Sequence, residues 1–398
     1  MPGETRTLQP LPPPPVWAGP PADDGTPRLD IRGMPPAELA DLMRVWGQPA
    51  YRAQQIFAAL HGRVVRRFAD IHVLPSGLRA ELAARATDAG LTPEARQTDP
   101  GDGTVKYLFR LADGNTVETV LMRYRYGYSV CVSSQVGCRM GCTFCASTLG
   151  GLARNLQAGE IAEQIDYINQ ELEACGAEGT LAERFPVPPD ERPDPGARFD
   201  RVARLVVMGM GEPMENLDEV VRFLRVAHEG TGAGIGWRHM TVSTSGLVPG
   251  IDRLAALDLP LTLAVSLHAP NDELRNRLVP LNRQYPLAEL LPACRRYAEA
   301  TGRRLTFEYV LIGGVNDLPE HARELGRLLR GTSCHVNLIP LNPVAERQLR
   351  ASSPEAAARF RGLLRGAGIP ATIRRQLGTA IDAACGQLRR RREEARRV

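Results

Sequence analysis

Apolar residues recur at helical spacing in the early part of the chain, between about residues 35 and 89. The recurring residues are Leu39, Leu42, Met43 and Trp46, then Ile56, Phe57 and Leu60, then Leu78, Leu82 and Ala86. Steps of three and four residues place such side chains on one face of a helix, and breakers at 47–49 and 75–77 separate the groups. The pattern predicts a small helical domain over residues 29–98.

The period changes to two after residue 104. Alternating stretches at 105–111 and 116–122 flank Ala112-Asp113-Gly114-Asn115, which is a hairpin signal. We therefore expect a β-hairpin extension over residues 99–127, followed directly by a third strand that ends near Val132.

Strand-like and helix-like segments alternate over the rest of the chain. The expected strands are 203–208, 239–243, 261–267, 305–311, 335–339 and 371–374. The expected helices are 159–174, 217–229, 247–256, 287–300, 319–330 and 354–366. Such alternation is typical of a parallel sheet with right-handed crossovers. The sequence predicts an α/β fold with a partial (β/α)6 TIM-like barrel over residues 128–388, and an open doubly wound sheet is the alternative.

Three segments depart from this pattern. Residues 1–28 are rich in proline and poor in apolar residues, so we expect a disordered leader. Residues 176–200 combine five prolines with many charges and are expected to form a mobile insertion in the barrel. Residues 389–398 are a run of charged residues, which is typical of a solvated basic tail.

The basic residues are almost all arginines. Of 49 lysines and arginines only Lys106 is a lysine. A Walker-A loop needs Gly-Lys-Ser/Thr and a pyridoxal Schiff base needs a buried amine. The sequence around Lys106 matches neither context, which argues against ATPase and aldimine chemistry. The helical domain carries Arg52, Arg63, Arg66 and Arg67, which suit contacts with RNA phosphates. A solvated basic face explains them equally well, because the net charge is only +4.

The cysteine content indicates the compartment. Eight cysteines in 398 residues are too few and too unevenly spaced for a secreted disulfide scaffold. Residues 1–24 lack the apolar stretch of a signal peptide. The most apolar window, 254–270, is interrupted by Asp258 and Pro260, which argues against a membrane span. We expect a cytoplasmic protein with reduced thiols and no membrane partner.

The strongest chemical signal is a run of three cysteines after the third strand, with the spacing Cys138-x3-Cys142-x2-Cys145. Three thiolates on one short loop can bind three irons of a [4Fe-4S] cluster and leave the fourth iron open. A structural zinc site is the alternative, but zinc loops typically use paired Cys-x2-Cys units. No second pair follows in the sequence, so the cluster is the favoured interpretation.

This cysteine spacing at the end of a first barrel strand resembles the radical S-adenosylmethionine (SAM) superfamily. The resemblance implies that SAM binds the open iron, and that Gly211 and Glu212, in Gly209-Met210-Gly211-Glu212-Pro213, contact its amino group. More candidate SAM-binding residues fall at the carboxyl ends of later strands, where a barrel places its site. They are Ser243, Ser266, Leu267, His268 and Asn342. Each alone is typical of a loop cap, but together they predict a ligand-lined rim.

Two more cysteines and one carboxylate narrow the resemblance. Whole segments are similar to those of the rRNA adenine methyltransferases that methylate through a cysteine. These segments are 131–138, 242–246, 266–272, 339–343 and 378–388, and they include Cys131 and Cys385. Glu118 matches that family's general base, although a solvent-facing residue is the simpler interpretation of its strand position. The resemblance covers residues 32–388.

The resemblance implies a reaction that uses two SAM molecules. The first methylates Cys385, which must be a thiolate. The second is cleaved at the cluster to a 5′-deoxyadenosyl radical, which takes a hydrogen atom from the methyl group on Cys385. The resulting methylene radical adds to adenine, and Glu118 accepts the ring proton. Cys131 then attacks Cys385, and the transient disulfide releases the methylated base.

The resemblance also implies the substrates and partners. The substrates are an adenosine in the peptidyl-transferase loop of 23S rRNA and the adenosine 3′ of the anticodon in tRNA, both methylated on carbon 2. The base must leave its stack to be reached. A flavodoxin or ferredoxin is the expected reductant, and we expect a monomer. The alternatives are the sister family that methylates carbon 8 and confers antibiotic resistance, and a zinc-stabilised RNA-binding protein without activity.

Overall fold

The computed structural model describes most of the chain. The described residues are 18–19, 28–88, 90–187, 192–342, 344, 347–378, 381 and 389. Most of the expected leader and basic tail lies outside them, and so does Cys385. Within the expected leader, β1 (Ala18–Gly19) pairs antiparallel with β2 (Arg28–Leu29), a strand pair that the proline-rich pattern does not predict.

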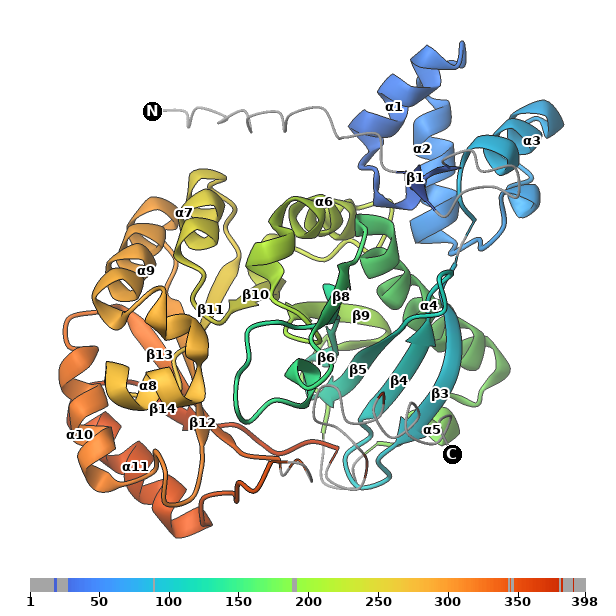
Figure 1. Ribbon diagram of the computed structural model, residues 1–398. Helices are drawn as coiled ribbons and strands as arrows, with labels where there is room; N and C mark the ends of the chain where they lie inside the picture. The colour runs from blue at the N-terminus through green and yellow to red at the C-terminus, as the bar shows by residue number, and fades with distance from the viewer. Residues whose placement is uncertain are drawn as a thin grey trace, which may run out of the picture.

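Residues 31–86 form a small helical unit, as the apolar spacing predicts. Its elements are η1 (Ile31–Gly33), α1 (Pro36–Val45), α2 (Arg52–Phe57), a π-helical turn η2 (Ala58–Gly62), η3 (Phe68–Asp70) and α3 (Ser76–Arg85). Leu39, Phe57 and Leu82, from the predicted apolar faces, are fully buried. The unit is drawn in blue at the upper right of Figure 1. Its contacts with the rest of the molecule include the packing of η1 against α4 (Ala158–Glu178) and α6 (Leu217–His228), and hydrogen bonds of His61 with Asp166 and of Glu38 with Arg222.

One large sheet forms the centre of the molecule. In the described residues its strand order is β14-β13-β12-β11-β10-β9-β6-β5-β4-β3. The strands that pair in parallel are β6 (Gly127–Cys131), β9 (Arg198–Val207), β10 (Met240–Thr244), β11 (Thr262–Ser266), β12 (Leu305–Leu311), β13 (Cys334–Pro340) and β14 (Ala371–Ile373). They follow one another across the sheet in chain order. A doubly wound sheet reverses its order at a switch point, so the sequential order confirms the partial barrel.

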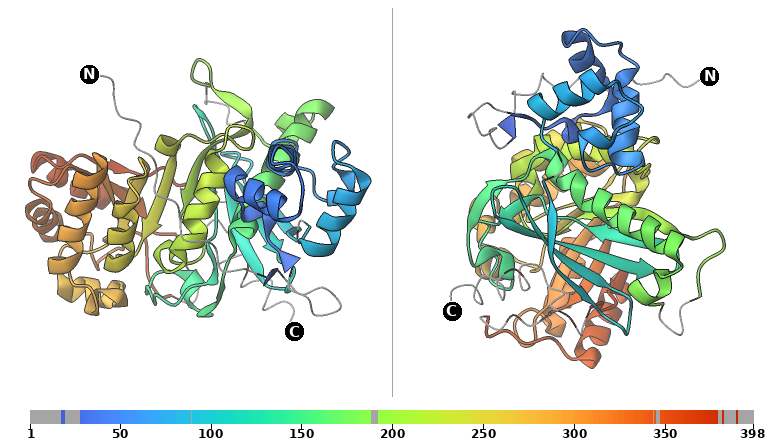
Figure 2. Two further views of the ribbon diagram at one scale, coloured as in Figure 1. Left: turned by 90° about the horizontal axis from the view of Figure 1, so that it is seen from above. Right: turned by 90° about the vertical axis from the view of Figure 1, so that its right-hand side faces the viewer.

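Helices follow the parallel strands and cover the outside of the barrel (Figures 1 and 2). They are α4 (Ala158–Glu178), α6 (Leu217–His228), α7 (Val248–Ala256), α9 (Leu287–Thr301), α10 (Pro319–Leu328) and α11 (Pro354–Gly366). All six were expected from the sequence, to within a few residues at their ends. A shorter helix, α8 (Asp272–Leu278), was not expected. Asn271 precedes it as the N-cap, and its side chain accepts a hydrogen bond from the Leu274 amide.

Antiparallel strands extend the sheet beyond β6. The predicted hairpin is present as β4 (Val105–Arg110) and β5 (Thr116–Tyr124), and β5 pairs antiparallel with β6. The sequence missed β3 (Thr92–Thr98), which pairs with β4 at the edge of the sheet. Its residues are mostly polar and only partly buried, as suits an edge strand. The hairpin is therefore part of the barrel's own sheet.

The expected mobile insertion at residues 176–200 contains more regular structure than its prolines suggest. α4 continues into it as far as Glu178, and a short helix, α5 (Leu181–Arg184), follows. Phe185 is buried and packs edge-on against the ring of Tyr128. The segment ends with the start of β9 at Arg198. This aromatic contact attaches the segment to the sheet through its described residues.

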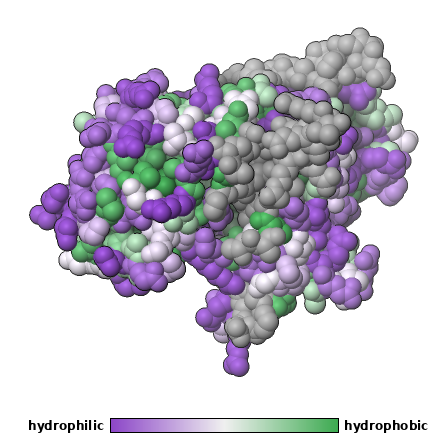
Figure 3. Space-filling view, turned by 60° about the horizontal axis from the view of Figure 1, so that its bottom comes forward, coloured by the Kyte–Doolittle hydropathy of each residue, from purple (hydrophilic) through white to green (hydrophobic). Residues whose placement is uncertain are grey.

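Hydrophilic side chains cover most of the described surface on the face shown in Figure 3, with smaller apolar areas between them. Several exposed arginines pair with a neighbouring acid, as Arg67 does with Asp70 and Arg253 with Asp218. Such pairs contribute little stability, because water and salt screen them. In the part of the chain that the structure describes, no helix is long and apolar enough to span a membrane.

Candidate active site

The cysteine motif occupies a loop whose two ends are joined by a pair of antiparallel strands. The loop connects β7 (Gln135–Gly137) to β8 (Leu152–Asn155), which pair antiparallel as a small separate sheet. The Cys138 amide donates to the Gly151 carbonyl at 2.9 Å. A Cβ on Gly137 would lie 2.0 Å from that carbonyl oxygen, and the φ of Gly137 is +78°. Only glycine fits there, so the backbone fixes where the first cysteine leaves the strand.

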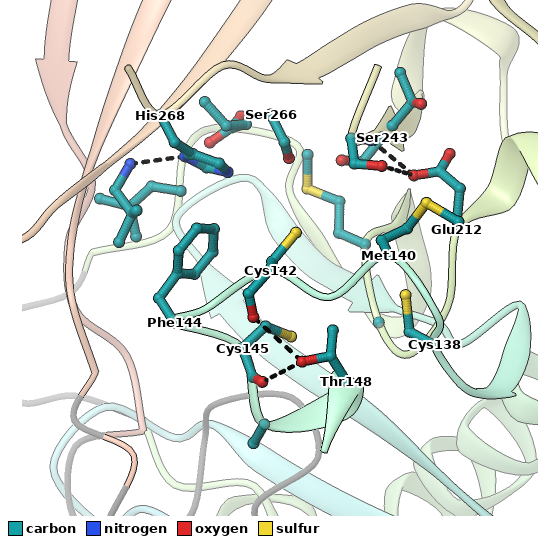
Figure 4. A pocket seen from close by; sticks show the side chains of 18 of the residues that line it. Cys138, Met140, Cys142, Phe144, Cys145, Thr148, Glu212, Ser243, Ser266 and His268 are labelled. Carbon is teal, nitrogen blue, oxygen red and sulfur yellow. Dashed lines mark hydrogen bonds between the residues drawn. The ribbon is translucent and has the colours of Figure 1, made fainter. Parts of the chain in front are cut away.

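The three cysteines of the motif line one cavity (Figure 4). The Thr148 hydroxyl lies 3.2 Å from the Cys142 carbonyl and 2.9 Å from that of Cys145, which holds the loop in a compact turn. Burial raises the pKa of Cys138 to about 12 and also raises the pKa of Cys142. These two side chains are therefore neutral thiols at pH 7 unless a metal displaces their protons.

The donor set fits an iron–sulfur cluster better than a single ion. A zinc ion needs four ligand atoms that converge on one point at about 2.0–2.3 Å. Among the described residues, no group of three or more His, Cys, Asp and Glu side chains is arranged to hold a metal ion. In a cubane each thiolate binds a different iron, so the thiols surround a volume without converging. Three cysteines around one cavity match that requirement.

The cavity lies at the carboxyl ends of the parallel strands, where barrels place their sites. Its volume is about 290 Å³, near the lower end of the roughly 300–1,000 Å³ of small-molecule sites. Six of the seven predicted SAM-binding residues line it: Gly211, Glu212, Ser243, Ser266, His268 and Asn342. The seventh, Leu267, has a fully buried side chain in the main apolar core, so it meets the cavity with backbone at most.

Glu212 is a buried carboxylate held in one orientation. Its Oε2 accepts hydrogen bonds from the amide and the hydroxyl of Ser245, both at 2.7 Å. Its Oε1 accepts from the Met214 amide at 3.1 Å. Burial raises the pKa of Glu212, and these hydrogen bonds oppose the rise. The neighbouring Gly211 has a φ of +107°, and a Cβ there would lie 2.5 Å from Gln135, so the turn that presents Glu212 requires glycine.

His268 is a neutral imidazole with a defined tautomer. Burial, aided by the charge on Arg275, lowers its pKa to about 3. Its Nδ1 accepts a hydrogen bond from the Val310 amide at 3.0 Å, so the ring proton must be on Nε2. The ring packs edge-on against Phe144, with centroids 4.7 Å apart (Figure 4). His268 thus offers the site a hydrogen-bond donor without a charge.

Cys131 opens onto a second cavity that adjoins the first. This cavity has a volume of about 170 Å³ and is lined by Cys131, Val120 and residues up to Leu377. Met208, Ile339, Pro340, Asn342 and Arg374 line both cavities. The described chain therefore runs along the second cavity at 374–377, a few residues before Cys385, which lies outside the described residues.

Glu118 lies on the strand that lines this second cavity, but it is not solvent-facing. Its register partner on β4 is Leu108, and that of Val120 is Lys106, so all four side chains leave the same face of the hairpin. Glu118 is 2% exposed and Lys106 is fully buried, with Nζ 2.9 Å from Oε2. The Arg389 amide donates to Oε1 at 2.7 Å. The expectation of a solvent-facing carboxylate is wrong.

Several residues at the site were not singled out from the sequence. They are Met140, Phe144, Thr148, Glu308 and Arg374, all of which line the first cavity. The sequence signal for Glu308 is that it is the one charged residue in the mostly apolar strand β12. It accepts a hydrogen bond from Asn337 at 2.9 Å, and burial raises its pKa. Lys106 was set aside because its sequence context matches no lysine chemistry, yet its amine is buried.

Comparisons with known proteins agree with this geometry. The model of the radical SAM superfamily matches residues 188–327. The crystal structure of a radical SAM methyltransferase from Sphaerobacter thermophilus is 48% identical, with a TM-score of 0.80, over 90% of this chain and 98% of that one. Together with the cysteine loop at the strand ends, these findings place the protein among the radical SAM enzymes. That class implies a [4Fe-4S] cluster and SAM as cofactors.

Closely related sequences narrow the class to one family. A probable dual-specificity RNA methyltransferase RlmN of Symbiobacterium thermophilum is 52% identical over 365 residues, which are 92% of each chain. A protein with the same description from Desulforamulus reducens is 46% identical over 92% of this chain and 97% of its own. The chain belongs to the RlmN family of radical SAM RNA methyltransferases.

Proposed function

We propose that this protein methylates carbon 2 of an adenosine in the peptidyl-transferase loop of 23S rRNA and of the adenosine 3′ of the anticodon in tRNA. The methyl group passes through Cys385, and two SAM molecules are used per turnover. The observation that carries the proposal is the pair of adjoining cavities. One holds the cysteine motif, and the other holds Cys131 beside the chain that leads to Cys385.

The first cavity is the SAM site in this proposal. Cys138, Cys142 and Cys145 would hold the cluster, which would supply one electron to bound SAM, so that SAM is cleaved to methionine and a 5′-deoxyadenosyl radical. Glu212 is fixed by Ser245, so its carboxylate is in place to accept from the SAM amino group. The Nε2–H of neutral His268 donates to an uncharged or anionic acceptor, and Ser243, Ser266 and Asn342 complete the rim.

The second cavity is the place of methyl transfer. Cys385 takes the methyl group of one SAM, gives one hydrogen atom of that methyl to the 5′-deoxyadenosyl radical, and bonds through the methylene carbon to adenine. The adduct then gives up one electron, for which the oxidised cluster would be the acceptor. Glu118 accepts the proton that leaves the ring carbon. Cys131, as a thiolate, then attacks the Cys385 sulfur, so the carbon–sulfur bond breaks and a disulfide forms. The released carbon keeps the electron pair and takes a proton, which completes the methyl group. The disulfide must be reduced before the next turnover, and a flavodoxin or ferredoxin system is the proposed source of electrons.

The substrate base must enter the cavity unstacked, and phosphate contacts offset the cost of extruding it. The helical unit is the proposed place of these contacts. Arg63 is exposed there. Arg66 instead donates to the Leu91 carbonyl and lies over the Tyr167 ring, and Arg67 pairs with Asp70. Arg52 donates to Gln55 Oε1 at 2.7 Å and lies over the Tyr51 ring. Of the four predicted arginines, Arg63 is therefore the best candidate for a phosphate contact.

Nucleoside mass spectrometry tests the proposal. Unmodified 23S rRNA and tRNA are incubated under nitrogen with the reconstituted protein, SAM and a low-potential reductant, then digested to nucleosides. We expect 2-methyladenosine from both RNAs. A product of 8-methyladenosine would assign the protein to the alternative chemistry, and an isolated protein that holds zinc and neither iron nor sulfide would exclude a radical reaction.

A further inference from the structure

Arg275 is a fully buried arginine behind the rim of the SAM cavity. It lies on α8 and has no exposed surface. Its Nε donates to the Leu267 carbonyl at 3.1 Å, and its Nη2 donates to the carbonyls of Ser245 and Ser266 at 2.6 and 3.1 Å. Its Nη1 donates to Asn282 Oδ1 at 2.8 Å. One side chain thus joins the ends of β10 and β11 to α8.

All four of these acceptors are neutral. In the described residues, no carboxylate lies within ion-pair distance of Arg275. Asp272 is on the same helix, but its Oδ1 accepts instead from Asn282 Nδ2 and the Leu287 amide, at 2.8 and 2.9 Å. Arginines are almost never fully buried without a counter-charge, because removing a cation from water is costly. The position of Arg275 therefore calls for negative charge nearby.

The cysteine loop lies against the same helix. The Thr143 amide, next to Cys142, donates to the Leu278 carbonyl at the end of α8, at 3.0 Å. Leu274 and Leu278 pack in one apolar cluster with Cys138 and Cys142. The Arg275 guanidinium and Cys142 lie within electrostatic range of each other. The guanidinium and the motif thus interact across a layer of low polarity, where charges act strongly.

We propose that Arg275 is the counter-charge of the iron–sulfur site, and that its buried cation makes the cluster easier to reduce. This rests on the proposed function, in which the three cysteines of the motif hold the cluster. An oxidised cubane carries two positive charges and its three thiolates carry three negative ones, so the assembly is a monoanion. One electron from a low-potential reductant makes it a dianion, and a fixed cation nearby favours that change. Arg275 is a positioning residue, not a catalytic one.

The test is a redox titration of the reconstituted full-length protein, followed by the electron paramagnetic resonance signal of the reduced cluster. Arg275→Gln removes the charge, Arg275→Lys keeps it with fewer donors, and Arg277→Gln is the matched control. Arg277 is an exposed residue of the same helix, so solvent screens its charge. Iron and sulfide are counted in every variant. We expect a more negative midpoint potential for Arg275→Gln, and potentials close to the wild type for Arg275→Lys and Arg277→Gln.

Each outcome decides the matter. A potential unchanged in Arg275→Gln with full iron and sulfide would overturn the proposal. Equal shifts in Arg275→Lys and Arg275→Gln, or loss of the cluster from both, would also overturn it, because the guanidinium geometry rather than its charge would then matter. If Arg275→Gln loses the cluster while Arg275→Lys keeps it at the wild-type potential, the charge is needed for assembly and the proposal stands. A wild-type protein that takes up no cluster would refute the proposed function instead.

Discussion

The only lysine of the chain is the buried partner of Glu118. Lys106 Nζ lies 2.9 Å from Glu118 Oε2, with side-chain exposures of 0% and 2%. The two residues are diagonal neighbours on β4 and β5, since Lys106 pairs with Val120 and Leu108 with Glu118. A buried ion pair is costly to break, because the remaining charge stays out of water. Lys106, the one lysine in the sequence, therefore holds the candidate base Glu118 in place.

Removing this lysine should destabilise the protein. Lys106→Met leaves the Glu118 carboxylate buried without its ammonium, which costs roughly 3–5 kcal/mol of unfolding free energy. Denaturant unfolding of the cluster-free protein under nitrogen measures the change. The double variant Lys106→Met with Glu118→Gln should regain part of the loss, because it removes the stranded charge. Arg110→Met is the control. Arg110 is on β4 like Lys106, but it is half-exposed and pairs with Glu94 of β3, so its replacement should cost about 1 kcal/mol or less. A single Lys106→Met variant as stable as the control would contradict this account of the pair.

Replacing the proposed resolving thiol should trap the RNA. Cys131→Ala leaves Cys385 able to form its bond to adenine and unable to release it, so covalently linked protein and RNA should accumulate. Denaturing gel electrophoresis and mass spectrometry detect the adduct. Cys334→Ala is the control, because Cys334 is buried at the start of β13 and lines neither cavity. Normal turnover by Cys131→Ala would show that another group releases the product.

Acid should destabilise the site through His268. Its pKa is about 3 in the folded protein against about 6.5 in an unfolded chain. Below about pH 6.5 the unfolded chain binds a proton that the folded protein does not, so stability falls as the pH drops from 6.5 toward 3. In His268→Asn this part of the pH dependence should disappear. We would compare unfolding midpoints at pH 8 and pH 5.5, with His72→Asn, at an exposed position, as control. An equal loss on acidification in wild type and His268→Asn would contradict the prediction.

An exposed arginine of the helical unit should contribute to RNA binding. Arg63→Ala should weaken binding of unmodified tRNA and lower the slope of log affinity against log salt by about one, as expected for one lost phosphate contact. Arg253→Ala on α7, 57% exposed, is the matched control on the barrel. Affinities measured by fluorescence anisotropy at several salt concentrations give the slopes. Equal slopes for Arg63→Ala and the control would place the RNA elsewhere.

Periodicity predicted the regular part of the fold, because the barrel strands are apolar runs separated by amphipathic helices. The expected strand at 305–311 coincides with β12, and the expected helix at 354–366 with α11. β3 was missed because it is a polar edge strand that contains Pro93. β7 and β8 were missed because each is short and exists only through its pairing around the cysteine loop. Contacts between distant segments, not local pattern, determine these elements.

The same limit applies to the site. Residues within motifs, such as Cys138, Glu212 and His268, were found because the motif itself is local. Lys106 and Arg275 were not assigned roles, because their partners depend on strand register and on the packing of α8. Leu267 was included with its motif neighbours, but it directly follows the end of β11 and its side chain is buried in the main apolar core.

Transfer of a deuterated methyl group tests the central claim most directly. The protein is incubated under nitrogen with RNA, reductant and SAM whose methyl group carries three deuterium atoms. The methylated adenosine and the 5′-deoxyadenosine are then analysed by mass spectrometry. If the methyl group passes through Cys385 as a methylene, 2-methyladenosine should retain two of the three deuterium atoms, and 5′-deoxyadenosine should gain one. A methylated adenosine that retains all three, with no deuterium in 5′-deoxyadenosine, would contradict the account.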